Sequence, residues 1–322
     1  MQTATKTAAA PESMDESYFW RDNNTLLFLR RAPGETVFRA VLVDALTGKE
    51  TVPQAFNDRN SPLMESSRML VSYAGSLESE MHYLPPTAAM SSDGKWLLWS
   101  NTASRARRQW VAATFEGQQQ AWAQGIDPYN STTDIGGHAF WMPDSERWVE
   151  LVNRYKNCVY SIHYANVYEP GKPAPIRTVR IRGLRDGLPV GIRQDGTVVM
   201  HTSFYERGKP VQQIDLSLVS VEADTATARK LSVPIPISNR VSDVKLSPRG
   251  DRLAWILEQE RSGKRLYTVY IADADGAHVR PVGSVEGITS GTGYTWARDL
   301  QWLPDGKQVS FVYKRAIYTH PV

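Results

Sequence analysis

KLSPRGDRLAWILEQERSGKRLYTVYIADADGAHVRPVG, residues 245–283, is the stretch of sequence that decides the fold. Two turn signals, Ser-Pro-Arg-Gly at 247–250 and Asp-Ala-Asp-Gly at 273–276, and one charged hairpin separate its apolar runs. This punctuation predicts four antiparallel strands. One sheet of this size cannot bury both of its faces, so it has to stack on further copies of itself.

The first turn of this segment recurs along the chain. Six positions align on it: Asp22, Asp93, Asp144, Asp195, Arg249 and Asp305. The steps between them are 71, 51, 51, 54 and 56 residues. A period near 50 with strand and turn punctuation is typical of the blades of a β-propeller.

Apolar residues keep a fixed register with these six anchors. Three residues before them stand Phe19, Met90, Trp141, Ile192, Leu246 and Trp302, and four residues after them stand Leu26, Leu97, Trp148, Val199, Leu253 and Val309. Six residues after them stand Phe28, Trp99, Glu150, His201, Trp255 and Phe311. Period-two spacing puts the last two sets on one face of each sheet, where we expect the blades to pack. Glu150 and His201 must therefore pair in a seam, or the alignment slips by one residue there.

We predict an all-β fold, a six-bladed β-propeller of four-stranded antiparallel blades, with seven blades as the alternative. The expected blades span about 14–56, 84–126, 137–182, 186–236, 240–285 and 294–322. The long first step indicates an insertion at about 57–83. The sixth copy lacks a fourth strand, so we expect the N-terminal segment, residues 1–13, to be either a tail or the strand that closes the ring and removes its edge.

Composition narrows the class of protein. Of the 322 residues 41% are hydrophobic, and the net charge of +3 is too small to mark a general nucleic-acid binder. Cys158 is the only cysteine, which excludes an intramolecular disulfide and a cysteine metal cluster. The first thirteen residues lack the apolar stretch of a signal peptide, and no run of eighteen apolar residues occurs. We expect no membrane insertion, while periplasm and cytoplasm both stay open.

The turn sequences SSDGK at 91–95, SPRGD at 247–251 and LPDGK at 303–307 resemble the TolB-like, or PD40, repeat, a WD40-like β-propeller repeat. YIADADGAHVRPV at 270–282 is similar to its third strand, tight turn and fourth strand. The resemblance implies a binding scaffold, often in the bacterial cell envelope. Related propellers precede α/β-hydrolase domains in some peptidases, but no Gly-x-Ser-x-Gly elbow occurs here. We therefore expect no enzyme.

Basic residues gather in the b–c hairpins, which join the second and third strands of each blade and lie opposite the a–b turns. Each copy contributes at least two. The predicted partner-binding set is Arg30, Arg31, Arg105, Arg107, Arg108, Arg154, Lys156, Arg207, Lys209, Arg261, Lys264, Arg265, Lys314 and Arg315. The a–b and c–d turns carry mainly Asp and Glu, which turn geometry explains. We expect a monomeric scaffold that presents this basic face to an acidic protein segment or another polyanion, without specific nucleic-acid binding.

A second candidate site lies where the innermost strands begin, at the mouth of the central channel. Glu16, Asp243 and Asp299 come from consecutive copies in a closed ring, and their oxygens suit Ca²⁺. Arg240 and Arg298 can pair with these carboxylates instead; we favour ion pairing and expect no cofactor. His138 at the same level is a candidate acid–base group. The alternative function is therefore a channel-mouth enzyme, a lyase or hydrolase acting on an acidic saccharide.

Overall fold

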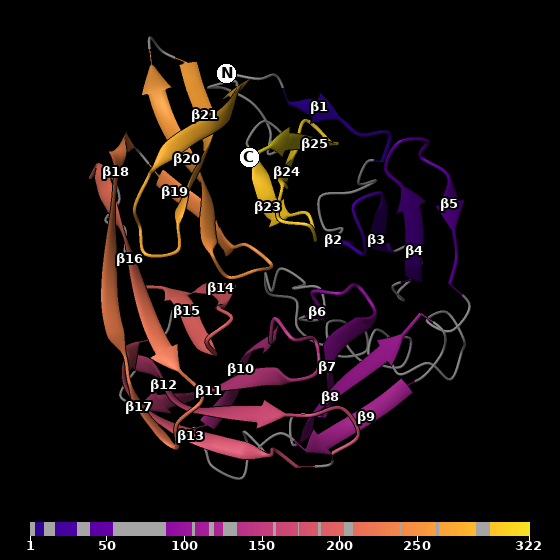
Figure 1. Ribbon diagram of the computed structural model, residues 1–322, viewed down its shortest axis with the longest axis vertical. Helices are drawn as coiled ribbons and strands as arrows, with labels where there is room; N and C mark the ends of the chain where they lie inside the picture. The colour runs from indigo at the N-terminus through magenta and orange to yellow at the C-terminus, as the bar shows by residue number, and fades with distance from the viewer. Residues whose placement is uncertain are drawn as a thin grey trace, which may run out of the picture.

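The computed structural model describes residues 4–9, 17–30, 39–53, 88–104, 107–115, 119–124, 134–156, 159–172, 174–185, 188–202, 209–238, 240–261, 264–287 and 297–322. Within these ranges the chain forms 25 β-strands and no helix. The strands make six small sheets that are arranged around a common axis (Figure 1). The protein is a six-bladed β-propeller, as the repeat period predicts.

The first three blades follow one another along the chain, each with its strands in sequence order. Blade 1 contains β2 (Ser17–Trp20), β3 (Thr25–Arg30), β4 (Arg39–Asp44) and β5 (Glu50–Thr51). Blade 2 contains β6 (Ala88–Met90), β7 (Trp96–Ser104), β8 (Arg107–Thr114) and β9 (Gln119–Gln124). Blade 3 contains β10 (Asp134–Trp141), β11 (Trp148–Lys156), β12 (Val159–Tyr168) and β13 (Arg177–Arg185).

The last three blades complete the ring. Blade 4 contains β14 (Leu188–Ile192), β15 (Thr197–His201), β16 (Val211–Ser220) and β18 (Arg229–Ser238). Blade 5 contains β19 (Arg240–Leu246), β20 (Arg252–Arg261), β21 (Lys264–Asp273) and β22 (Arg280–Gly287). Blade 6 contains β23 (Arg298–Trp302), β24 (Gln308–Tyr313), β25 (Ala316–Pro321) and, from the other end of the chain, β1 (Thr5–Lys6).

The N-terminal segment closes the ring. Strand β1 pairs antiparallel with β25, with Thr5 opposite Thr319, and the backbone N–H of Thr7 donates to the carbonyl of Ile317 at 2.9 Å. The next N–H, of Ala8, donates to Ala45 of blade 1 at 2.8 Å. Strands near the two ends of the chain, β1 and β25, therefore lie side by side in blade 6 (Figure 1). The expectation that the N-terminal residues supply the missing fourth strand is confirmed.

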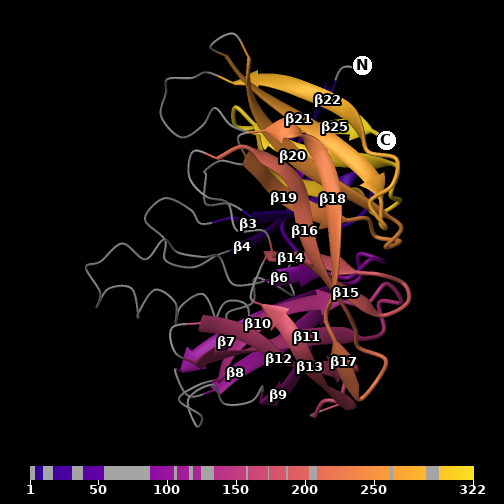
Figure 2. The same cartoon turned by 90° about the vertical axis from the view of Figure 1, so that its left-hand side faces the viewer.

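Blade 3 carries a fifth strand that the sequence pattern does not predict. Strand β17 (Thr225–Thr227) is part of the connection between β16 and β18 of blade 4. It pairs parallel with β13 of blade 3, with Arg180 opposite Thr225 (Figures 1 and 2). A three-residue Thr-Ala-Thr strand has too few positions for an apolar alternation, so periodicity cannot reveal it. It covers part of the outer edge of blade 3.

Each seam between blades is filled by one cluster of buried apolar side chains. The seam between blades 6 and 1 contains Leu26 and Phe28, and the seam between blades 5 and 6 contains Val309 and Phe311. All four are 0–1% exposed. These residues occupy the predicted packing positions. Burying a side chain of this size stabilises the fold by about 1.5–3 kcal/mol.

Two blades depart from the predicted register because their a–b turns are one residue shorter. In blade 1, Trp20 pairs with Leu26, so Trp20 rather than Phe19 fills the apolar position before the turn. In blade 4, Ile192 pairs with Val198. Val198 and Met200 therefore face blade 3, whereas the residues assigned to those positions by sequence alignment, Val199 and His201, lie on the opposite face of β15.

The a–b turns of neighbouring blades touch one another. A Cβ on Gly94 of blade 2 would overlap the carbonyl oxygen of Arg21 in blade 1, and a Cβ on Gly250 of blade 5 would lie 2.6 Å from the Cα of Arg193 in blade 4. Across the closure, the N–H of Asp305 donates to Oδ1 of Asn23 at 3.2 Å. These contacts fix the a–b turns on one side of the ring, so the b–c hairpins lie on the other.

The predicted insertion at 57–83 lies outside the described residues. In the described part of the chain, no helix has the length and hydropathy of a membrane-spanning segment.

Candidate functional site

The acidic residues of the a–b and c–d turns serve mainly to shape those turns. Oδ1 of Asp22 accepts hydrogen bonds from the N–H groups of Asn24 and Thr25, each at 2.8 Å. Asp44 forms the same kind of turn with Thr47, and these hydrogen bonds lower the pKa of Asp44. Asp93, Asp144, Asp195, Asp275 and Asp305 each accept from the N–H two residues further on. This geometry explains why Asp recurs there.

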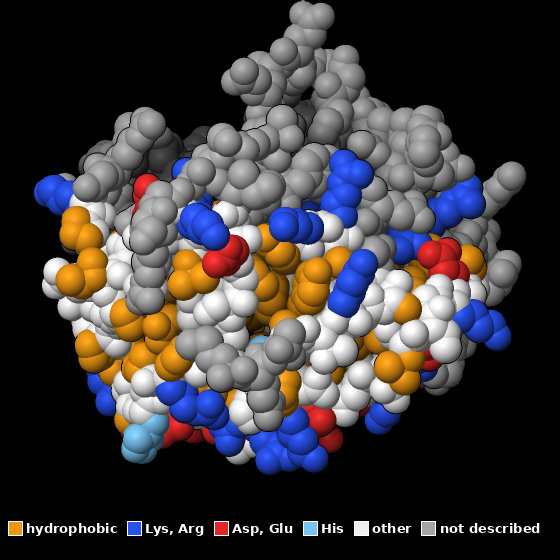
Figure 3. All heavy atoms as spheres, turned by 90° about the horizontal axis from the view of Figure 1, so that it is seen from above, with side chains coloured by type: hydrophobic (Ala, Val, Ile, Leu, Met, Phe, Trp, Pro, Cys, Tyr) orange, Lys and Arg blue, Asp and Glu red, His pale blue; other side chains and the backbone are white. Residues whose placement is uncertain are grey.

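Basic side chains are interleaved with these acids. Arg147 binds Asp144 at 2.9 Å and reaches Glu222 of the next blade at 3.4 Å, and Arg177 binds Glu222 at 2.8 Å. Figure 3 shows basic and acidic side chains next to one another along its lower edge. The turn side is therefore of mixed charge rather than simply acidic.

The fourteen residues of the predicted partner-binding set fall into three groups, according to how much of each residue the structure describes. Arg31, Arg105 and Arg207 lie outside the described residues. For five more, the structure describes the backbone, which lies in strands next to b–c connections, but not the side chain: Arg107, Arg108, Arg154, Lys156 and Arg261. The side chains of the remaining six are described: Arg30, Lys209, Lys264, Arg265, Lys314 and Arg315.

Arg30 differs from the other five because its side chain is buried. The residue is 7% exposed, its guanidinium forms an ion pair with Glu50, and that group also lies 4.6 Å from the centre of the Phe28 ring. Arg30 therefore joins strands β3 and β5 of blade 1 and presents little charge to a partner.

The other described members are exposed on the b–c side. Lys264 pairs with Glu286 at 3.1 Å and Arg265 lies 3.6 Å from Glu258, both within blade 5. Exposed ion pairs of this kind contribute about 0–1 kcal/mol, so either cation can exchange its partner at little cost.

Lys314 and Arg315 form the two-residue b–c turn of blade 6. Tyr313 and Ala316 close the turn as a pair, and both central residues are left-handed, with φ of 48° and 59°. Asn-Gly is the preferred sequence for such a turn. A left-handed residue with a side chain costs about 1–2 kcal/mol. Two basic side chains thus occupy a turn whose backbone would favour other residues.

At the channel mouth, Asp243 and Asp299 occupy equivalent places in blades 5 and 6. Each lies at an irregularity of the innermost strand and is left-handed, with φ of 53° and 55°. Arg298 binds Asp299 at 2.6 Å, which is the ion pair that the sequence suggests. The N–H groups of Asp299 and Leu300 donate to the Asp243 carboxylate. Burial raises the pKa of both aspartates, and the charge of Asp243 raises the pKa of Asp299 further.

The other predicted channel residues are less well placed. Glu16 lies outside the described residues, and β2 of blade 1 pairs with β3 without the irregularity that holds Asp299 in blade 6. His138 lies in β10, between the two residues where its pairing with β11 shifts register, and its side chain is not described. Arg240 is exposed at the start of β19, and its charge has only a small effect on Asp243. Among the described residues no three His, Cys, Asp or Glu side chains form a metal-binding group.

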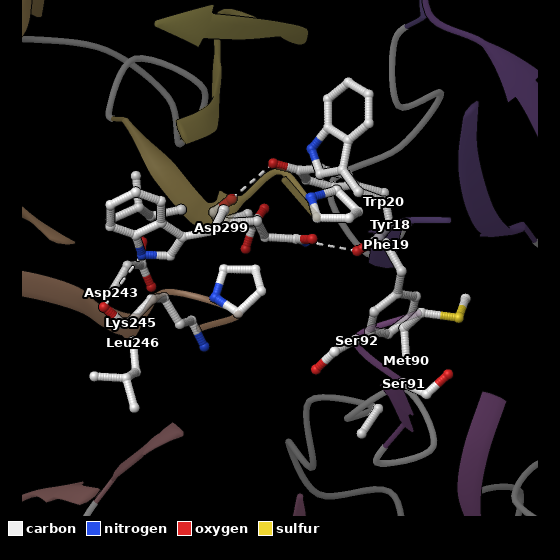
Figure 4. Close-up of a pocket in the computed structure, with 16 residues that line it drawn as sticks. Tyr18, Phe19, Trp20, Met90, Ser91, Ser92, Asp243, Lys245, Leu246 and Asp299 are labelled. Carbon is white, nitrogen blue, oxygen red and sulfur yellow. Dashed lines mark hydrogen bonds between the residues drawn. The ribbon is translucent and has the colours of Figure 1, made fainter. Parts of the chain in front are cut away.

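A cavity of about 520 Å³ adjoins the two aspartates (Figure 4). The innermost strands of blades 1, 2, 5 and 6 line it. Ser92, Pro248 and Pro304 of the a–b turns also line it, so it extends toward that side of the ring. Asp243, Lys245 and the aromatic ring of Phe19 belong to its walls as well. Its volume lies in the range of small-molecule sites, roughly 300–1,000 Å³.

Sequence reasoning missed Lys245, although a signal exists. The residues that stand immediately before the apolar position at the end of each innermost strand are Phe19, Ala89, Phe140, Gly191, Lys245 and Gln301. Four of the six line the cavity. Lys245 is the one charged member of this set, so the inward alternation of the strand would have revealed it.

Glu150 and His201 do not form a pair. Glu150 is buried between blades 2 and 3 at the expected position, and it accepts a hydrogen bond from the Tyr168 hydroxyl at 3.0 Å. The ring of Tyr168 stacks on Trp148 with 4.1 Å between ring centres. His201 faces the seam between blades 4 and 5, and burial lowers its pKa to about 4. Of the two predicted explanations, a slip of one residue holds for His201.

Comparison with known proteins places the chain by fold. Neither protein-family models nor curated protein sequences match it. Among solved structures, prolyl oligopeptidase B from Galerina marginata is similar at 10% identity, with a TM-score of 0.50 over 92% of this chain and 38% of that chain.

Two further solved structures are similar over most of this chain. A structure from a study of two prolyl endopeptidases matches at 15% identity and a TM-score of 0.46, over 94% of this chain and 38% of that chain. The WD40 domain of SCAP from fission yeast matches at 8% identity and a TM-score of 0.39, over 99% of this chain and 72% of that chain. This chain thus spans about 38% of the length of either peptidase structure. At 10% identity the likeness to prolyl oligopeptidase B is one of fold.

Proposed function

We propose that this protein is a non-catalytic binding module of the TolB-like (PD40) type, whose b–c side binds an acidic segment of a partner protein. We further propose that the protein acts in the bacterial cell envelope, where such repeats are often found. We also propose that the propeller is monomeric. It assigns no catalytic residue, because Asp299 already pairs with Arg298 and Asp243 already accepts two backbone N–H groups.

The Lys314–Arg315 turn is the observation that carries the proposal. Its two left-handed residues are exposed and basic, although Asn-Gly would form the same turn with less strain. Strained residues that persist at an exposed position are characteristic of functional sites. The ammonium of Lys314 lies 5.0 Å from the centre of the Tyr313 ring, so the turn also combines charge with an aromatic surface.

The neighbouring hairpin of blade 5 extends this basic surface. Lys264 and Arg265 open β21, and their acidic neighbours Glu286 and Glu258 hold them only through exposed or partly exposed pairs. An acidic peptide that replaces these carboxylates would gain several charge-assisted contacts together.

The test uses poly-L-glutamate as the acidic probe and a variant that separates strain from charge. Replacing the turn with Lys314→Asn and Arg315→Gly removes two charges and relieves the backbone. We expect the variant to be more stable by about 1 kcal/mol and to bind the probe more weakly. Binding is measured by fluorescence anisotropy as a function of salt, where loss of two contacts flattens the dependence.

Charge reversal supplies the matched comparison. Lys314→Glu with Arg315→Glu should weaken binding strongly, whereas Lys49→Glu with Lys307→Glu, an equal change of charge on exposed residues of the turn side, should leave it nearly unchanged. Equal effects of the two variants would show that only net charge matters and would overturn the proposed surface. Binding of heparin with no binding of poly-L-glutamate would contradict an acidic protein segment as the partner.

A further inference from the structure

The central cavity has two chemically different walls. Blades 5 and 6 supply Asp243, Lys245 and Asp299, and blades 1 and 2 supply Phe19 and Met90, which lie across the view from Asp243 and Lys245 (Figure 4). Phe19 and Met90 also pack on the same apolar cluster beside the cavity. A ligand in this space therefore meets charge on one side and apolar surface on the other.

Lys245 is the basic residue that lines this cavity. Within the described part of the chain, the Lys245 ammonium forms no hydrogen bond and no ion pair. Its charge nevertheless acts on both aspartates and favours their ionised forms. The ammonium thus shares one cavity with two carboxylates that have other partners: Asp299 pairs with Arg298, and Asp243 accepts two backbone N–H groups.

We propose that the cavity binds a small zwitterion with an apolar side chain, of the chemical class of the apolar α-amino acids. The ligand carboxylate accepts hydrogen bonds from Lys245, and the ligand ammonium donates to the carboxylates of Asp299 and Asp243. Its side chain lies against Phe19 and Met90. This site is independent of the basic b–c surface and reaches the opposite, a–b side of the ring.

The charges of the cavity select against simpler ligands. A cation without an acceptor would approach Asp243 and Asp299 but would leave Lys245 without a partner and near a like charge. An anion without a donor would satisfy Lys245 but would meet the carboxylate of Asp243 and that of Asp299, whose charge only Arg298 offsets. The zwitterion satisfies both, and its ammonium would offset the burial that disfavours ionisation of the aspartates. Charge-assisted hydrogen bonds of this kind provide selectivity as well as affinity.

Isothermal titration calorimetry on the full chain tests the proposal with a set of related probes. L-phenylalanine and L-leucine should bind. Phenethylamine, which lacks the carboxylate, and 3-phenylpropanoate, which lacks the ammonium, should each bind at least about tenfold more weakly, since each loses charge-assisted hydrogen bonds. This comparison uses the unmodified protein, so it does not depend on the folding of a variant.

Lys245→Met keeps most of the side-chain volume and removes the ammonium. It should weaken L-phenylalanine binding by about tenfold or more, while Lys230→Met, at an exposed residue of β18, should have no effect. Circular dichroism and thermal melting verify that both variants fold. Absence of binding by either amino acid, or an unchanged affinity in Lys245→Met, would overturn the proposal. Equal binding of phenethylamine would show a cation site instead, and equal binding of 3-phenylpropanoate an anion site.

Discussion

Gly94 gives the sharpest test of how the blades are joined. It ends the SSDG turn of blade 2 with φ of +70°, and a Cβ at this position would overlap the carbonyl oxygen of Arg21 and lie 2.9 Å from the carbonyl carbon. Gly306 ends the equivalent turn of blade 6 with φ of +69°, and a Cβ there would meet nothing within 4 Å. The two glycines share a conformation and differ in their contact with the preceding blade.

The expected effects follow from this difference. Gly306→Ala should cost only the left-handed conformation of an alanine, about 1–2 kcal/mol. Gly94→Ala carries the same cost and in addition forces apart two pieces of backbone, which adds about 1–3 kcal/mol or more. With an unfolding entropy of about 2.1 cal/mol/K per residue, each kcal/mol lowers the melting temperature of a chain of this size by about 1.5 °C. Gly94→Ala should therefore melt clearly below Gly306→Ala.

Differential scanning calorimetry of both variants beside the unchanged protein measures the difference. Gly250→Ala, whose Cβ would lie 2.6 Å from the Cα of Arg193, should behave like Gly94→Ala. Equal melting temperatures for Gly94→Ala and Gly306→Ala would mean that the turns of blades 1 and 2 do not touch. The placement of all a–b turns on one side of the ring would then lose its support.

Two further predictions concern buried polar groups. Burial lowers the pKa of His201 to about 4, so the unfolded chain takes up this proton at a higher pH than the folded protein does. Above about pH 6.5 the neutral imidazole costs the folded protein no stability. As the pH falls toward 4, the free energy of unfolding falls by up to about 3 kcal/mol. His201→Leu should therefore show a flatter loss of melting temperature across this range, and an unchanged profile would contradict the burial of the imidazole. Ser310, 0% exposed, accepts from the indole of Trp20 at 2.7 Å and contacts the hydroxyl of Tyr18 at 3.2 Å across the closure. Ser310→Ala should destabilise the protein by about 1–3 kcal/mol in denaturant unfolding, since it leaves a buried donor without its acceptor; Ser242→Ala, at a half-buried serine, is the comparison, and equal stability of the two would refute this role for Ser310.

The fold was predictable because its signals repeat. Turns such as LPDGK and the apolar positions on either side of them recur six times, and the missing fourth strand of the last copy pointed to the N-terminal segment. The errors arose where one turn residue was absent. With one residue fewer between Trp20 and Leu26, and between Ile192 and Val198, a fixed spacing assigned Phe19 and His201 to the wrong faces.

The candidate sites were less predictable, for physical reasons. Charge at a hairpin can be read from sequence, but burial of Arg30 depends on Glu50, a residue two strands away. The left-handed backbone of Lys314 and Arg315 has no composition signal of its own. The cavity is lined by the innermost strands of four blades. The position of Lys245 in its wall therefore becomes visible only when the blades are assembled around the axis.

Closure of the ring by the chain's two ends is the claim on which the cavity and both surfaces depend, and one cross-link tests it directly. Thr5 and Thr319 stand opposite each other in an antiparallel pair. Such positions are about 4.5–5.5 Å apart between Cα atoms, a separation that a disulfide spans. In a Cys158→Ser background, Thr5→Cys with Thr319→Cys should form an intramolecular disulfide on mild oxidation and raise the melting temperature. Two thiols that stay free in the folded, oxidised protein would contradict a ring closed by β1.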